Sequence, residues 1–138
     1  MTLYEIVTNI QNIAKDIPNM HSISEGDIYV INQNQTIRYK TLVITQQSHT
    51  ENTEDNTITY HFYLFEVDRM MEGKTNKLQI QSTAIVDLHN IIKQIGDLDG
   101  VLDLDSVAYN TFEKFNDVCA GAYADVTITC NINDCNVL

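Results

Sequence analysis

The sequence predicts a single α+β domain over residues 1–138, with two helices packed on one face of a mostly antiparallel sheet that contains a long β-hairpin. Two segments repeat apolar residues at helical spacing, and several others are β-branched or alternate between apolar and polar residues. These segments follow one another as helix, strands, helix, strands, and no repeat or linker divides them. A chain of 138 residues can bury a core without metal or disulfide support.

The first predicted helix covers residues 2–17. Thr2 and Glu5 have the spacing of a capping box at its start, and Pro18 ends it because the residue before a proline is pushed out of helical geometry. Its apolar residues form one stripe: Leu3, Ile6, Val7, Ile10, Ile13, Ala14 and Ile17.

The segment after Pro18 is predicted to contain the hairpin. In order, we expect a loop with a short strand at 28–31, a polar turn at 32–35, a long strand at 37–49, an acidic polar loop at 50–57 and a second long strand at 58–69. The centre of the second long strand, residues 62–65, is apolar at consecutive positions. This pattern predicts an interior strand that is covered on both faces.

The second helix is predicted over residues 76–95. Asn76 and Gln79 resemble a capping pair, and one face carries Leu78, Ile85, Leu88, Ile92 and Ile95, with Ala84 and Ile91 beside them. A turn region at 96–100 leads to two further strands, at about 106–115 and 122–132. The last strand alternates apolar and polar residues, which predicts a half-exposed antiparallel strand.

The composition is strongly acidic, with a net charge of −11, and residues 97–138 hold eight acids against Lys114 alone. Binding to a phosphate backbone requires clustered Lys and Arg, so direct DNA binding is excluded. An acidic surface suits a protein that DNA passes, although solubility explains the charge equally well. No apolar stretch is long enough to cross a bilayer and no export signal is visible, so we expect a soluble protein without membrane contact.

Patterns typical of metal sites are incomplete. The acidic run at 97–105 places Gly100 at the wrong position for a calcium-binding EF-hand loop, so we expect a solvated turn there, with a weak divalent site left open. The four histidines are not paired at zinc-ligand spacing, and we expect His61 to be a hydrogen-bonded structural or interface residue. The three cysteines form no C-x-x-C pair, and we expect reduced thiols.

Patterns typical of catalysis are also incomplete, so we expect no catalytic residue, cofactor or metal. Gly73, Lys74 and Thr75 precede a helix as in a phosphate-binding loop, but Asp68 stands where the loop needs its first glycine. Glu66 and Asp68 have strand spacing that puts two carboxylates on one face, with Arg69 on the other. Such a pair can perform acid–base chemistry, but a solvated or salt-bridged strand end is far commoner.

Four segments carry a resemblance to known proteins: "GDIYVIN" (26–32), "YKTLVITQQSH" (39–49), "YHFYLFEVDRM" (60–70) and "TNKLQIQS" (75–82). Together they resemble small proteins of the head-to-tail module of tailed phages of Bacteroides, crAss-like phages included. The order of elements is similar to that of tail-terminator and neck-ring proteins, which place a long hairpin and two helices in one small α+β domain.

The resemblance implies a virion structural protein, made in the bacterial host cytoplasm, that forms a homo-oligomeric ring at the head-to-tail connector. Such a ring holds about six or twelve subunits in a closed heterologous arrangement. DNA would pass through its channel without specific binding. The partners would be other copies of the chain and the adjacent neck, portal or tail proteins.

Nine residues are candidate contacts between subunits or between rings: Glu51, Glu54, Asp55, His61, Tyr63, Asp68, Arg69, Met70 and Met71. The alternative is a phage assembly factor or another non-enzymatic protein-binding module, such as a host-encoded adaptor. Portal, terminase and tail genes beside this gene, or the protein's presence in purified virions, would favour the ring.

Overall fold

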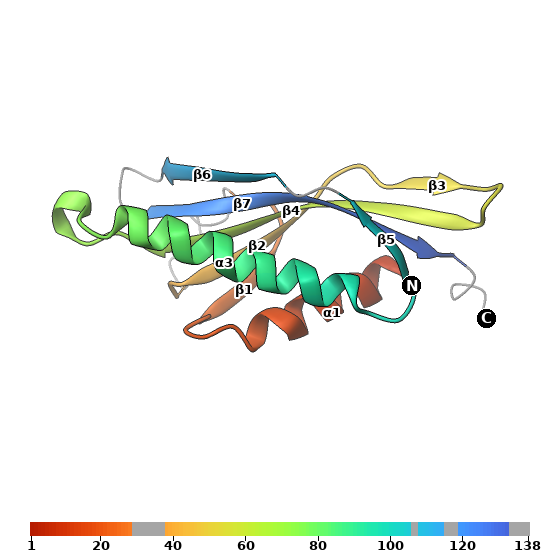
Figure 1. The fold of residues 1–138 in the computed structure, drawn as a ribbon, viewed down its shortest axis with the longest axis horizontal. Helices are drawn as coiled ribbons and strands as arrows, with labels where there is room; N and C mark the ends of the chain where they lie inside the picture. Colours follow the sequence, from red (N-terminus) through yellow and green to blue (C-terminus); the bar gives the residue numbers. More distant parts are fainter. Residues whose placement is uncertain (29–37, 106–107, 115–118, 133–138) are drawn as a thin grey trace.

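The predicted α+β fold is confirmed by the computed structural model, which describes residues 1–28, 38–105, 108–114 and 119–132 (Figure 1). Its helices are α1 (Leu3–Lys15), the short 3₁₀ helix η1 (Glu72–Lys74) and α3 (Lys77–Gly96). Its strands are β1 (Ser22–Glu25), β2 (Thr41–Gln46), β3 (Thr50–Asn52), β4 (Thr57–Arg69), β5 (Val101–Asp105), β6 (Tyr109–Lys114) and β7 (Cys119–Asn131).

The sheet is built around β4 and β7, two strands of 13 residues that pair antiparallel along their whole length. On the outer edge of β4, β2 pairs with residues 62–67 and β3 with residues 57–59. On the outer edge of β7, β6 pairs with residues 119–124 and β5 with residues 127–130. Only β1 is parallel to its neighbour, β2, so the sheet is mostly antiparallel.

Both helices lie on the same face of the sheet and bury one core with it (Figure 1). The capping box of α1 is confirmed, because the Glu5 backbone N–H donates to Thr2 Oγ1 at 3.1 Å. α1 contributes Ile6, Ile10 and Ala14 to the core. The sheet contributes alternate residues: Leu42, Ile44, Tyr60, Phe62, Leu64, Ala122, Ala124, Val126, Ile128 and Cys130. The alternation predicted for the last strand is therefore confirmed.

The expectation that β4 is covered on both faces is wrong. β4 is an interior strand of the sheet, but the helices cover only one of its faces, and His61, Tyr63 and Phe65 on the other face are half-buried. A small second cluster covers one end of this open face, where Val43, Val67 and Cys119 are buried. The consecutive apolar residues of β4 therefore face two different surfaces, the core under the helices and the open face of the sheet.

The predicted strand at 37–49 is shorter and is broken before β3. The His49 ring explains the break, because its Nδ1 accepts the backbone N–H of His61 at 3.2 Å, where a strand carbonyl would otherwise serve. The chain then continues along β4 as β3, inside the segment predicted to be a loop. The hairpin exists, but its outer strand has two parts.

Several other boundaries differ from the predictions. β1 and β5 lie in segments predicted as a loop and a turn, and both are short strands at sheet edges. Leu78 is 69% exposed, while Ile80 takes its place on the buried face of α3. Asn76 does not pair with Gln79, since its Oδ1 accepts the Met71 backbone N–H at 2.7 Å. The strand predicted at 28–31 lies mostly outside the described residues, as does the turn at 32–35.

Candidate functional site

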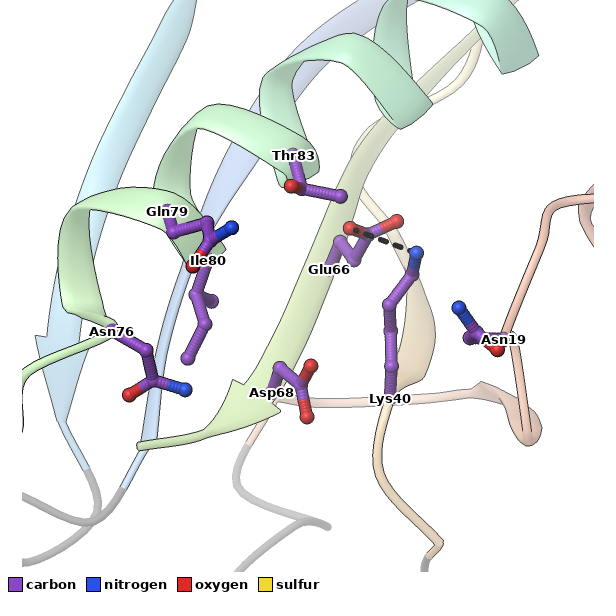
Figure 2. A pocket seen from close by; sticks show the side chains of 8 residues that line it. All are labelled: Asn19, Lys40, Glu66, Asp68, Asn76, Gln79, Ile80 and Thr83. Atoms are coloured by element: carbon purple, nitrogen blue, oxygen red, sulfur yellow. Dashed lines mark ion pairs between the residues drawn. The ribbon is translucent and has the colours of Figure 1, made fainter. Parts of the chain in front are cut away.

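A polar pocket of about 240 Å³ lies beside the end of β4, where the first turns of α3 face the segment that leads into β2 (Figure 2). Pockets for drug-sized ligands begin at about 300 Å³, so this one fits the end of a single side chain or a similarly small molecule. Seven of the eight lining residues are polar: Asn19, Lys40, Glu66, Asp68, Asn76, Gln79 and Thr83, with Ile80 the exception.

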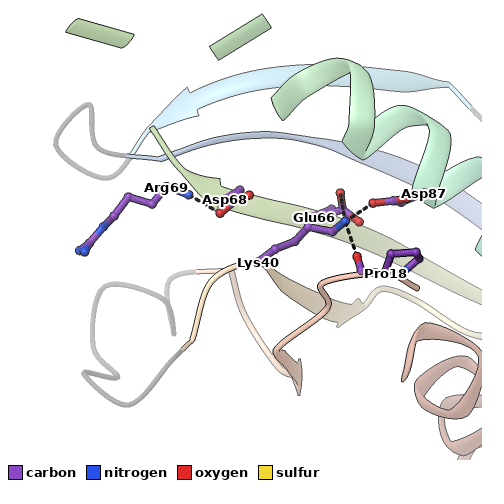
Figure 3. A network of polar contacts seen from close by, with 6 residues as sticks. All are labelled: Pro18, Lys40, Glu66, Asp68, Arg69 and Asp87. Carbon is purple, nitrogen blue, oxygen red and sulfur yellow. Dashed lines mark hydrogen bonds and ion pairs between the residues drawn. The ribbon is translucent and has the colours of Figure 1, made fainter. Parts of the chain in front are cut away.

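Three buried charged side chains, Lys40, Glu66 and Asp87, meet beside this pocket (Figure 3). Glu66 follows Leu64 on the helix-covered face of β4, and it is only 2% exposed. Asp87 lies on the buried face of α3, and Lys40 immediately precedes β2. The packing of α3 on the sheet therefore brings together residues that are distant in the sequence.

The Lys40 ammonium is held by partners from within the chain. It forms an ion pair with Asp87, donates to the carbonyl of Pro18 at 3.1 Å and lies 3.8 Å from Glu66 Oε2 (Figure 3). A lysine has three N–H donors, and two of them are used by Asp87 and Pro18. The third donor lies beside the Glu66 carboxyl, so the ammonium is poorly placed to bind an anion from outside.

The Glu66 carboxyl titrates far from its ordinary range. Its pKa is raised from 4.5 to about 9, mainly by burial and next by a hydrogen bond with Asp87, while the Lys40 ammonium acts in the opposite direction. Glu66 Oε1 is buried and has no hydrogen-bond donor among the described residues. A proton on Glu66 resolves this deficit, because the protonated carboxyl can donate to Asp87. At neutral pH the three groups then carry no net charge.

The end of β4, residues 66–69, has charged side chains on two different sides. Glu66 and Asp68 lie on one face as predicted, and both line the pocket. Arg69 points away from it, with its guanidinium 5.5 Å from the centre of the Tyr39 ring. Asp68 Oδ1 accepts the backbone N–H of Arg69 at 2.8 Å. Asp68 and Arg69 are thus linked through the backbone, and no side-chain pair joins them among the described contacts.

The open face of the sheet carries a continuous aromatic row. It consists of His61, Tyr63 and Phe65 on β4, Tyr123 on β7 and Phe112 on β6. Neighbouring ring centres are 5.1 to 6.5 Å apart, within the range of favourable aromatic pairs. His61 also contacts Asp125 through Nε2, so it is hydrogen-bonded as expected. All five rings of this aromatic row are half-buried.

The remaining candidate contact residues lie in two places. Glu51, Glu54 and Asp55 are exposed on the β3–β4 hairpin, at the opposite end of β4 from the pocket. Met71 is 63% exposed after β4. Met70 is only 8% exposed and packs with Ile80 and Ala120 under α3, so little of its side chain is available for a contact between subunits.

Two of the three buried charged residues left a signal in the sequence. Glu66 interrupts the apolar alternation of β4, and Asp87 interrupts the apolar stripe of α3 between Ala84 and Leu88. A charged residue on an otherwise apolar face predicts a buried partner. Lys40 left no comparable signal, because the residues around it do not identify its inward face.

The chain matches no protein-family model, and no curated protein matches it significantly. Within the described ranges, no three His, Cys, Asp or Glu side chains are placed to hold a metal ion. In the same part of the chain, no helix is long and apolar enough to cross a membrane.

Proposed function

We propose that this protein is a structural component of a tailed-phage virion, which forms a homo-oligomeric ring around the DNA channel at the head-to-tail connector. The observation that carries the proposal is the presence of apolar side chains on opposite sides of the molecule, half-buried on the open sheet face and exposed on the helix side. Subunits of a closed ring contact each other head to tail, so each needs two different surfaces that fit one another.

The first surface is the aromatic row on the open sheet face. Monomeric proteins rarely leave a contiguous apolar patch uncovered without a partner. The second surface lies on the helix side, where Leu78 and Val86 of α3 are 69% and 55% exposed and Tyr4 of α1 is 80% exposed. The sheet separates the two surfaces, which supports contact between the sheet side of one subunit and the helix side of the next.

The hairpin and the charge fit the same arrangement. Figure 1 shows the β3–β4 hairpin extending beyond the ends of both helices, and residues 50–56 are exposed. This polar arm, with Glu51, Glu54 and Asp55, is suited to contacts with an adjacent ring. A net charge of −11 lets DNA slide past without adhering.

The direct test is the assembly state of the purified protein. We expect mass photometry and class averages from electron microscopy to show closed rings of about six or twelve subunits, as closed cyclic symmetry requires. A chain that stays monomeric at all accessible concentrations overturns the proposal.

Two variants test whether the ring uses the two surfaces. Tyr63→Asp places a charge in the aromatic row and Leu78→Asp places one on the helix side, so each variant alone should abolish the ring. A mixture of the two variants should form heterodimers, because the intact aromatic row of Leu78→Asp can bind the intact helix side of Tyr63→Asp. These heterodimers cannot grow, since the two surfaces left free are the altered ones. Gln94→Asp, at an exposed position of α3, is the matched control and should still form rings.

The position in the particle separates the ring from the alternative of an assembly factor. Electron cryomicroscopy of the phage should locate the protein at the neck, and mass spectrometry should detect it in purified virions. Rings that form in solution but are missing from mature particles would favour the assembly factor.

A further inference from the structure

His49 lies where the outer strand of the hairpin breaks, between β2 and β3, and both of its ring nitrogens are engaged. Nδ1 accepts the backbone N–H of His61 on β4 at 3.2 Å. Nε2 lies 3.2 Å from the amide oxygen of Gln46, at the end of β2. The ring therefore joins the outer edge of β4 to the end of β2, at the point from which the chain continues into β3.

The neighbouring side chains fix the tautomer of this ring. Gln46 donates its amide N–H to the Glu25 carboxylate on β1 at 2.7 Å, which turns its amide oxygen toward His49. An amide oxygen only accepts hydrogen bonds, so Nε2 carries the proton of the neutral imidazole. Nδ1 is then left with the lone pair that the His61 N–H requires.

A second proton on the ring is incompatible with this arrangement. It would occupy Nδ1 and point at the His61 N–H, which places two donors against each other. The rings of Tyr60 and Phe62, centred 5.3 and 5.6 Å away, also cover the imidazole. Burial accordingly lowers the pKa of His49 from its ordinary value of 6.5, and the charge of His61 acts in the same direction. A protonated ring therefore has to leave its site or deprive the His61 amide of its acceptor.

The titratable groups around this ring have partners of their own. His61 of β4 contacts Asp125 of β7, and Glu25 of β1 reaches the imidazole only through Gln46. The Tyr60 hydroxyl donates to a backbone carbonyl at 2.8 Å. Histidine is the side chain that ordinarily changes charge between pH 5 and 8, so the two imidazoles have to be tested separately. The α1 side chains that line a groove with Gln46 are uncharged: Leu3, Tyr4, Val7, Thr8 and Gln11.

β3 itself is weakly attached to the sheet. It is three residues long, all of them exposed, and it pairs with residues 57–59 of β4. Segments with few buried apolar contacts open at a lower cost than the rest of a fold. β4 is held independently, because it pairs with β7 along its whole length. β3 can therefore detach while the remainder of the sheet stays intact.

We propose that His49 is a pH-sensitive switch for the polar arm, residues 50–56. Neutral His49 holds β3 against β4, and its protonation releases β3 while the rest of the sheet stays folded. The sign follows from the two states of the ring, since the released form binds a proton more readily than the held form. The arm is therefore fully held above the ordinary pKa of histidine, and release is favoured as pH falls below it.

Amide hydrogen exchange of the full chain tests the switch, with each rate corrected for the intrinsic rate at the same pH. We expect the protection of residues 50–52 and of the His61 amide to fall by up to about thirtyfold between pH 7.5 and pH 5. This is the factor for a group that is protonated only in the released state, where its pKa is 6.5. Amides in the middle of α3 should keep their protection, because that helix is packed in the core.

Three variants assign the effect to one imidazole. In His49→Asn an amide oxygen can accept the His61 N–H but cannot gain a proton, so the arm should be equally protected at both pH values. His61→Gln removes the neighbouring imidazole and keeps its backbone N–H, so the wild-type dependence should persist. His89→Asn, at an exposed position of α3, is the matched control and should also behave as wild type.

Three results would overturn the proposal. The first is a wild-type arm whose protection is the same at pH 7.5 and pH 5. The second is a loss of protection in acid that is as large in His49→Asn as in wild type. The third is disappearance of the pH dependence in His61→Gln, which would assign the effect to the other imidazole. Because His49 and its partners belong to one chain, these outcomes do not depend on ring assembly.

Discussion

Replacing Glu66 with glutamine should change how the stability of the protein depends on pH. The folded-state pKa of Glu66 is about 9 against an ordinary value of 4.5, so the folded protein keeps a proton that the unfolded chain has lost. Stability is therefore complete below the unfolded pKa and falls as pH rises toward the folded pKa. The difference of one bound proton changes the free energy of unfolding by about 1.4 kcal/mol per pH unit, so wild type should lose roughly 3 kcal/mol between pH 6 and 8 through Glu66.

Glutamine cannot ionise, and its amide can donate to Asp87 as the protonated carboxyl does. We expect Glu66→Gln to match wild type within about 1 kcal/mol at pH 6 and to exceed it by about 2 to 3 kcal/mol at pH 8. Urea unfolding at pH 6, 7 and 8 measures the difference directly. Contributions from other titrating groups largely cancel, because only one side chain changes.

The control is Glu72→Gln, which removes an exposed carboxylate near the end of the same strand. Its unfolding free energy should follow that of wild type at each pH. If the difference between wild type and Glu66→Gln is constant from pH 6 to 8, Glu66 is ionised throughout and the reasoning about the buried site fails. A carboxyl titration of Glu66 by NMR gives the same answer independently.

Four further substitutions test the packing and the helix cap, each measured by thermal or urea unfolding. Gly121→Ala should destabilise by about 3 kcal/mol or more, because an added Cβ would lie 1.9 Å from the backbone oxygen of Glu66. Thr2→Ala should cost about 1 kcal/mol through loss of the helix cap. Phe62→Ala should cost roughly 3–5 kcal/mol. Phe65→Ala on the open face should cost clearly less, and equal costs would contradict the assignment of the two faces.

The elements that could be predicted from the sequence are those whose pattern is local. α1 shows its apolar stripe and its cap within one segment, and the alternation along β7 matches its burial. β1 and β5 are short, and each forms only by pairing with a distant strand, so neither has enough residues for a pattern to emerge. The acidic residues of β5 also resemble a solvated turn, although the strand sits at the sheet edge.

The candidate site was harder to predict, because its geometry arises from tertiary contacts. The sequence predicts Glu66 and Asp68 on one face, which the structure confirms, but it indicates Arg69 as the nearest charged neighbour. The partners of Glu66 are Lys40, from the segment before β2, and Asp87, from α3. Only the packing of α3 on the sheet reveals them.

Stability alone does not account for these buried charges. Well-packed apolar residues in place of a buried ion pair are often neutral or stabilising by 1–4 kcal/mol, while removing one partner is strongly destabilising. Glu66 adds to this cost, because its carboxyl is held protonated at neutral pH in a largely apolar sheet. The buried cluster is therefore expected to be no more stable than a well-packed apolar site of the same shape, and loss of Lys40 alone should cost more than replacement of all three residues.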